Sequence, residues 1–194
     1  MAVTMNRVLS EAFGPTEGAA RLAKDVALVL AGIAALTIAA KIRVLTWPVP
    51  ITMQTFAVLT IGAGFGLRLG LITLLGYLAL GAAGVAVFAG DTAGLAYMTG
   101  PTAGYLIGFA FATAAMGALA RRGWDRSVTG MAGAMLIGTA IIYAFGLAGM
   151  SALFLADKGG AWVLQHGMLN FLLGDALKLA LAALVVPGLW KLAR

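Results

Sequence analysis

Apolar stretches long enough to cross a lipid bilayer follow one another along most of this 194-residue chain. A membrane-spanning helix needs about 20 predominantly apolar residues, because no water reaches its backbone in the hydrocarbon. Only 10% of the residues are charged, whereas a water-soluble domain carries about a quarter. The chain has too few charges to cover a water-facing surface. The sequence therefore predicts an all-α membrane protein with membrane lipid as its solvent.

The chain contains six such stretches, and each is a candidate transmembrane helix. The predicted spans are residues 22–42, 52–67, 69–88, 101–121, 128–150 and 164–188. The second span is short and follows two prolines, and the FGLRLG between the second and third spans fits a tight hairpin. We expect residues 1–20 to form a cytoplasmic N-terminal segment and 21–194 a single six-helix domain. An apolar run at 26–40 resembles a signal-peptide core, but the similar stretches after it favour a packed span.

Lysine and arginine are distributed unequally between the two predicted sides of the membrane. Lys41, Arg43 and Lys158 fall on one side, and Lys178 lies inside the last span. Nine share the other side, namely Arg7, Arg21, Lys24, Arg68, Arg121, Arg122, Arg126, Lys191 and Arg194. Because positive residues concentrate on the cytoplasmic side, we predict a multi-pass protein of the cell membrane with both termini cytoplasmic. The net charge of +6 then needs no nucleic-acid partner, which would require a clustered basic face.

The last predicted span carries two opposite charges three residues apart, within FLLGDALKLALAALVVPGLW. Asp175 lies eleven residues after Leu164, about 17 Å along a helix and hence near the middle of the bilayer. An isolated charge there costs at least about 2.5–3.5 kcal/mol on insertion scales. The i, i+3 spacing places Asp175 and Lys178 on one face, where they can pair. The pair is either a structural element or a site for a ligand with donors and acceptors, and intramembrane charges usually mark ligand or ion pathways.

Two further segments carry unusual polar and aromatic residues on the predicted outer side. Residues 89–105, AGDTAGLAYMTGPTAGY, combine glycines that permit tight turns with tyrosines that stack on apolar groups and hydrogen-bond at their tips. The segment WPVPITMQT places Thr52, Gln54 and Thr55 at the outer end of the second span. Both segments also have a structural explanation, as an ordinary connection and as helix capping.

Alanine recurs at every fourth position of the first span, at Ala19, Ala23, Ala27, Ala31, Ala35 and Ala39. On a helix this spacing makes a stripe of small side chains. In lipid such a stripe lets two helices approach closely. The stripe predicts either packing within the chain or a docking face for another subunit, centred on Ala27, Ala31 and Ala35.

The sequence does not indicate catalysis. The absence of cysteine excludes a thiolate nucleophile, a disulfide framework and a cysteine metal site. Ser10, Ser127 and Ser151 lack a GxSxG context and His166 is the only histidine, so a hydrolase triad is not indicated. A metal site formed by His166, Asp91 and the intramembrane aspartate has no support from their spacing, and we expect no cofactor. Without a Walker motif the chain is not expected to hydrolyse ATP.

Three segments in matching order resemble BioY, the biotin-binding membrane subunit of energy-coupling-factor (ECF) vitamin importers. They are PVPITMQTFAVL, GLAYMTGPTAGYLIGF and GDALK, and the resemblance covers about residues 20–190. It implies a six-helix fold of the S-component type and capture of biotin from outside the cell. It also implies partnership with a transmembrane T subunit and two ATP-hydrolysing subunits.

The resemblance further implies roles for individual residues. Asp175 would accept hydrogen bonds from the ureido N–H groups of biotin, and Lys178 would donate to polar acceptors nearby. Gln54 matches the PVPxTxQT segment. The loop that covers the ligand would contribute Gly94, Tyr97, Gly100, Pro101, Thr102 and Tyr105. The alanine stripe fits the face by which S components dock on the T subunit.

Biotin's valerate carboxylate has no evident cation in the outer loop, where Asp91 is acidic. Backbone N–H groups, Thr92, Lys41 or Arg43 are the candidate partners. Three alternatives to the biotin hypothesis remain, namely a proton-coupled or stand-alone carrier that titrates Asp175, an S component for another vitamin, and a scaffold subunit without a ligand. The sequence leaves open whether the chain forms homo-oligomers or transports without an ECF module.

Overall fold

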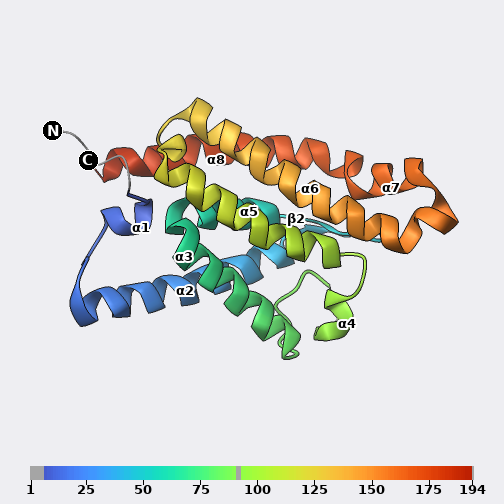
Figure 1. Cartoon of the computed structure of the whole chain (residues 1–194), viewed down its shortest axis with the longest axis horizontal. Coiled ribbons are helices and arrows are strands. Elements are labelled where there is room, and N and C mark those ends of the chain that lie inside the picture. The colour runs from blue at the N-terminus through green and yellow to red at the C-terminus, as the bar shows by residue number, and fades with distance from the viewer. Residues whose placement is uncertain (1–6, 91–92, 194) are drawn as a thin grey trace.

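The computed structural model describes residues 7–90 and 93–193, which form an elongated bundle of long helices (Figure 1). Within this described part, five helical stretches are long and apolar enough to cross a membrane: Gly18–Lys41, Gln54–Ala82, Ala103–Arg121, Val128–Lys158 and Gly160–Leu192. A single two-residue antiparallel ladder pairs Arg43 with Thr52 and Val44 with Ile51. The prediction of a mostly helical protein with several apolar spans is confirmed.

The elements follow the predicted spans closely along most of the chain. In order they are α1 (Leu9–Ala12), α2 (Gly18–Lys41), β1 (Arg43–Val44), β2 (Ile51–Thr52), α3 (Gln54–Ala82), α4 (Leu95–Met98), α5 (Ala103–Arg121), η1 (Trp124–Arg126), α6 (Val128–Lys158), α7 (Gly160–Gly167), η2 (Leu169–Phe171) and α8 (Leu172–Leu192). Helix α6 continues past the predicted end at residue 150, because no helix-breaking residue follows until Gly159, whose φ of +78° ends the helix.

Helix α3 contains the boundary that was predicted between the second and third spans. Gly66 has φ +76° and ψ −179°, a conformation open almost only to glycine. A Cβ atom built on Gly70 would lie 3.5 Å from the Cα of Gly62, whereas eight residues of straight helix cover about 12 Å. The two arms of α3 on either side of Gly66 therefore fold back on each other, as FGLRLG predicts.

Helix α5 runs between α3 and α6 (Figure 1) and approaches both of them backbone to backbone. A Cβ atom on Gly117 would lie 2.3 Å from the Leu67 nitrogen, and one on Gly104 would lie 2.2 Å from the Phe145 carbonyl oxygen. No side chain fits at either position. These glycines allow the close helix contacts that stabilise association where lipid supplies no hydrophobic driving force.

The segment before α2 packs against the bundle. Val8 and Leu9 are buried in the core, and the Ser10 hydroxyl donates a hydrogen bond to the Phe65 carbonyl at 3.4 Å. Glu11 forms an ion pair with Arg121 at 2.8 Å. Part of the segment 1–20, which was predicted to precede the helical domain, thus contributes to the core of that domain.

A buried polar contact lies at the same end of the bundle. Asp125 is 1% exposed and accepts a hydrogen bond from Trp190 Nε1 at 2.6 Å. The Arg126 guanidinium lies over the Trp190 ring, 4.6 Å from its centroid. Burial raises the pKa of Asp125 to about 6. The turn between α5 and α6 is thereby fixed to the last turns of α8.

Helix α2 lies at the periphery, with only 17% of its most apolar window buried. Its buried residues are Gly32, Leu36, Ala39 and Ala40. The central alanines of the predicted stripe, Ala27, Ala31 and Ala35, are exposed. Most of the stripe therefore does not pack within this chain.

The last predicted span, 164–188, is not one continuous helix, which corrects the expectation of an unbroken helix from Leu164 to Asp175. Met168 has φ −143° and ψ −56° between α7 and η2. The Gly167 carbonyl accepts a hydrogen bond from the Tyr105 hydroxyl at 2.6 Å, so the helix loses an internal acceptor at this point. Asp175 consequently lies in the first turn of α8, where the helix dipole favours a negative charge, and not in the middle of a helix.

We predict that Gly66→Ala destabilises the protein by about 1–3 kcal/mol, because alanine must adopt a strained backbone conformation there. The new Cβ atom would also lie 3.1 Å from a Val8 methyl group. Thermal unfolding of the purified protein in detergent measures the change. Gly64→Ala is the matched control, since its Cβ atom meets only Leu9 at 3.9 Å. Equal midpoints for both variants would show that the break at Gly66 is not required.

Candidate functional site

One cavity collects most of the residues that the sequence singled out. It lies among the β1–β2 hairpin, the start of α3, and helices α4, α5, α6 and α8, and it encloses about 570 Å³ of space, its open mouth included. Its polar lining includes Gln54, Thr55, Tyr143, Asp175 and Lys178. Its apolar lining includes Val49, Leu106, Phe109, Ile142 and Phe171. A few convergent polar groups among apolar walls are typical of a small-molecule site.

Asp175 and Lys178 form the ion pair that their spacing predicts, with 2.8 Å between Lys178 Nζ and Asp175 Oδ1. Both side chains are nearly buried, at 11% and 8% exposure respectively. Thr55 Oγ1 accepts a hydrogen bond from Lys178 at 3.0 Å and donates one to Asp175 Oδ1 at 3.4 Å. The Tyr143 hydroxyl donates to Asp175 Oδ2. Each charge is therefore compensated by groups of the protein itself, as a buried ion pair requires.

Three separate helices bring this cluster together. Thr55 lies in the first turn of α3, beside the β2 residue Thr52, whose hydroxyl accepts a hydrogen bond from the Gln54 backbone at 3.2 Å. Tyr143 projects from the middle of α6, and Asp175 and Lys178 from the first two turns of α8. The break before α8 places Asp175 in the first turn of that helix, and both members of the pair line the cavity.

Gln54 is 5% exposed and belongs to a second hydrogen-bond chain. Its Nε2 donates to the Tyr77 hydroxyl at 2.9 Å, and that hydroxyl donates to the Val87 carbonyl at 3.0 Å. These bonds fix the amide of Gln54. Its Oε1 has no donor among the described residues, so it can accept one from a ligand.

The loop predicted to cover a ligand divides into residues that line the cavity and residues that shape the loop. Tyr97, Thr102 and Tyr105 line the cavity. Gly94, Gly100 and Pro101 do not line it. The Gly94 N–H donates to the Gly81 carbonyl at 2.8 Å, and the Gly100 N–H to the Tyr97 carbonyl at 3.2 Å. Gly94 and Gly100 therefore shape the path of the loop through their backbone hydrogen bonds.

Tyr97 is held in place by an aromatic contact. Its ring stacks on Phe88, with 4.7 Å between the centroids and an interplanar angle of 12°. Burial raises the pKa of the Tyr97 hydroxyl above its ordinary value, so this group stays protonated and can donate a hydrogen bond.

Two of the candidate partners for a ligand carboxylate, Lys41 and Arg43, do not line the cavity. Lys41 Nζ donates to the Phe88 carbonyl at 2.7 Å, which ties the end of α2 to the outer loop. Arg43 lies in β1 opposite the cavity-lining β2. Asp91 and Thr92 lie outside the described residues. Among the described residues that line the cavity, Lys178 is the only cation.

His166 lies away from this cluster. Its ring stacks on Trp162 with 4.2 Å between centroids, and its Nδ1 lies 3.0 Å from the Trp162 carbonyl oxygen. It does not line the cavity with Asp175. The structure thus does not bring these two proposed metal ligands together.

Tyr143 is the missed cavity residue that contacts the ion pair directly. It supplies a hydroxyl to Asp175 from within a span that is otherwise almost entirely apolar. A tyrosine inside such an apolar span was the available signal. All four tyrosines of the chain either line the cavity or bond to a residue that does. Phe109 and Phe171 carried no such signal, since an aromatic residue in an apolar span is usually core.

The helical bundle, with one partly enclosed polar site between its helices, defines a ligand-binding membrane protein of the S-component fold. A solved structure described as the S-component for biotin from an ECF-type ABC transporter matches with a TM-score of 0.75 and covers 91% of this chain and 95% of that one. The two sequences are 22% identical, so this likeness establishes the fold.

The chain belongs to the BioY family, whose profile matches residues 6–194. A probable biotin transporter BioY of Pyrococcus horikoshii is 37% identical over 86% of this chain and 96% of its own length. The biotin transporters BioY of Rhizobium etli and Thermotoga maritima are 35% and 34% identical over 71% and 85% of this chain, and 76% and 96% of their own lengths. The resemblance inferred from the three sequence segments is confirmed.

We predict that Lys178→Met destabilises the ligand-free protein by about 3 kcal/mol or more, because Asp175 then keeps a buried charge without its cation. The double variant Asp175→Asn, Lys178→Met removes both charges and still offers Tyr143 an acceptor. It should recover part of the loss. Unfolding of the purified variants in detergent completes this double-mutant cycle. Strictly additive effects would contradict the coupling.

Proposed function

We propose that this chain is the biotin-binding subunit of a vitamin importer and that the cavity above Asp175 and Lys178 holds biotin. The observation that carries the proposal is this nearly buried ion pair, which hydrogen-bonds to Thr55 and Tyr143 at the base of an apolar-walled cavity. It occurs in a chain whose relatives are described as biotin transporters.

The chemistry of biotin's ureido ring matches this cluster. The ring presents two N–H donors and one carbonyl acceptor. A carboxylate offers about four lone-pair positions, so Asp175 can accept from ureido N–H groups and keep its bonds to Lys178 and Tyr143. Lys178 keeps a third N–H donor for the ureido oxygen, beyond those it gives to Thr55 and Asp175. Binding therefore need not break the ion pair.

The rest of the molecule matches the walls. Biotin's thioether ring and aliphatic tail are apolar, and Phe109, Ile142 and Phe171 line the cavity beside the polar cluster. Tyr97 and Tyr105 offer both an aromatic face and a hydroxyl. In this orientation the ureido head lies at the base, and the carboxylate points toward the mouth.

The proposed topology has six membrane crossings and two cytoplasmic termini. Each arm of α3 makes one crossing, with the reversal at Gly66 on the cytoplasmic side. The excess of lysine and arginine on the side of the termini supports this arrangement. The cavity then opens outward, beneath the β1–β2 hairpin and the loop that contains α4.

We propose docking of α2 on a T subunit of an ECF module, with its ATP-binding subunits supplying hydrolysis. The exposed alanines Ala27, Ala31 and Ala35 support this assignment, since most of α2 remains unburied by this chain. Small side chains allow a second helix to approach closely within the membrane.

We predict that the purified protein binds biotin, and that Asp175→Asn or Lys178→Ala weakens binding by about a hundredfold or more, the cost of truncating one member of a buried charge pair. Isothermal titration calorimetry with biotin measures both. The matched controls are Asp157→Asn and Lys158→Ala, which change exposed residues outside the cavity and should bind as the wild type does. Absence of wild-type binding at micromolar biotin would refute the proposal.

We also predict that biotin amides such as biocytin bind within about tenfold of biotin, because the carboxylate end points toward the mouth. Competition titration of the wild type with the amide checks this orientation. If the amide binds far more weakly, the carboxylate lies against Lys178 and the ureido head lies near the mouth. A dethiobiotin titration in the same series reports on the apolar contacts to the thioether ring.

A further inference from the structure

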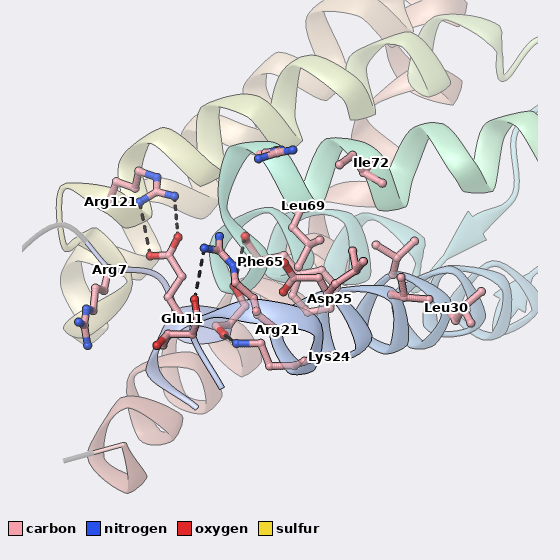
Figure 2. A pocket seen from close by; sticks show the side chains of 17 residues that line it. Arg7, Glu11, Arg21, Lys24, Asp25, Leu30, Phe65, Leu69, Ile72 and Arg121 are labelled. Carbon is pink, nitrogen blue, oxygen red and sulfur yellow. Dashed lines mark hydrogen bonds and ion pairs between the residues drawn. The ribbon is translucent and has the colours of Figure 1, made fainter. Parts of the chain in front are cut away.

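A second and larger cavity lies at the opposite end of α2, beside α1 (Figures 1 and 2). It is bounded by α1, the first half of α2, the part of α3 around its break and the last residue of α5. It encloses about 1830 Å³ of space, its open mouth included. Because the spans α2, α3 and α5 all turn or end here, this cavity lies where the bilayer meets water. We call it the interfacial cavity.

The interfacial cavity carries an excess of positive charge. Five cations line it, namely Arg7, Arg21, Lys24, Arg68 and Arg121, against the two carboxylates Glu11 and Asp25. Glu11 pairs with Arg121 at 2.8 Å, and Asp25 lies 3.7 Å from Arg21. Both carboxylates are thus already matched to a cation.

The remaining three cations differ in whether they have hydrogen-bond partners within the protein. Lys24 Nζ donates to the Ser10 carbonyl at 2.9 Å and to the Phe13 carbonyl at 3.2 Å. The guanidinium groups of Arg7 and Arg68 have no hydrogen-bond or ion-pair partner among the described residues, and both residues are exposed. The cavity therefore offers two arginines to an anionic ligand.

The other walls of the interfacial cavity are apolar. Leu22, Val26 and Leu30 recur every fourth residue along α2 and face it, together with Leu69 and Ile72 of α3. Leu22 and Leu30 are 67% and 63% exposed. Figure 2 shows Arg7, Glu11 and Arg121 at one end of the cavity and Leu30, Leu69 and Ile72 toward the other. Along α2 the charged lining residues end at Asp25, and the lining beyond it is apolar as far as Leu30.

We propose that the interfacial cavity binds an anionic phospholipid. Its phosphate would accept hydrogen bonds from Arg7 and Arg68, and its acyl chains would lie along the apolar residues of α2 and α3. The charged end and the apolar wall of the cavity correspond to the charged headgroup and the apolar acyl chains of such a lipid. A free phosphate ion would use only the charged end and leave Leu22 and Leu30 uncovered.

This assignment is independent of the biotin site. The bound lipid would join α1 and α2 to α3 at the end where α2 makes little contact with the bundle. Its recognition requires only the charge and the apolar surface at a membrane interface, where each basic residue adds to the affinity for anionic lipid. Zwitterionic lipid lacks the net charge that the two arginines select.

Native mass spectrometry of the purified full-length protein tests the proposal, with phosphatidylglycerol and phosphatidylcholine as paired probes. We expect phosphatidylglycerol to be retained preferentially, and Arg7→Gln, Arg68→Gln together to weaken its binding by about tenfold or more. The matched control is Arg122→Gln, Lys191→Gln, which removes the same charge from exposed residues at this end that do not line the cavity. It should retain the lipid.

Three outcomes would overturn the assignment. They are equal retention of both lipids, equal loss in the cavity and control variants, and full competition by glycerol 3-phosphate, which would indicate a site for a soluble anion. Biotin titration of the same samples shows whether each variant is folded. A cavity variant that binds biotin normally but loses the lipid preference supports the proposal whether or not an ECF module is present.

Discussion

The ion pair between Asp175 and Lys178 depends on contacts from three helices, and it explains much of the arrangement around it. A charge in the interior of a membrane protein must have partners, because neither lipid nor apolar side chains can solvate it. Thr55 at the start of α3 and Tyr143 in the middle of α6 supply these partners. Helices α3, α6 and α8 must therefore converge at this point, and the cavity lies where they converge.

Glycine and a helix break make this convergence geometrically feasible. Backbone contact at Gly104 brings α5 against α6. The hydroxyl of Tyr105, the residue after Gly104, donates a hydrogen bond to the Gly167 carbonyl where α7 ends. One segment of α5 therefore contacts both α6 and the break in the last span. The interruption places Asp175 in the first turn of α8, where its charge is favoured by the helix dipole.

The two cavities differ in the balance of their charges. In the cavity of the ion pair, one carboxylate and one ammonium compensate each other and leave a site for a neutral polar group such as a ureido ring. In the interfacial cavity, cations outnumber carboxylates and two arginines have no partner among the described residues. Such an excess is tolerated only near water, because each isolated charge would be costly at the depth of the first site.

The sequence alone determined the properties that depend on local pattern. Hydropathy predicted the helical spans, FGLRLG predicted the reversal at Gly66, and the i, i+3 spacing predicted that Asp175 and Lys178 pair. The three quoted segments also indicated the family. These features depend on a residue and its near neighbours along the chain, so a linear pattern contains them.

The tertiary structure alone decided the properties that depend on contacts between distant residues. The span at 164–188 is broken where Tyr105, from another helix, bonds to Gly167. Tyr143 joined the site, and Gly94, Gly100 and Pro101 fell outside its lining, because helix packing sets which side chains converge. No periodicity along the chain records which face of α2 remains exposed or which arginines lack a carboxylate. Those outcomes follow from the packing of whole helices against one another.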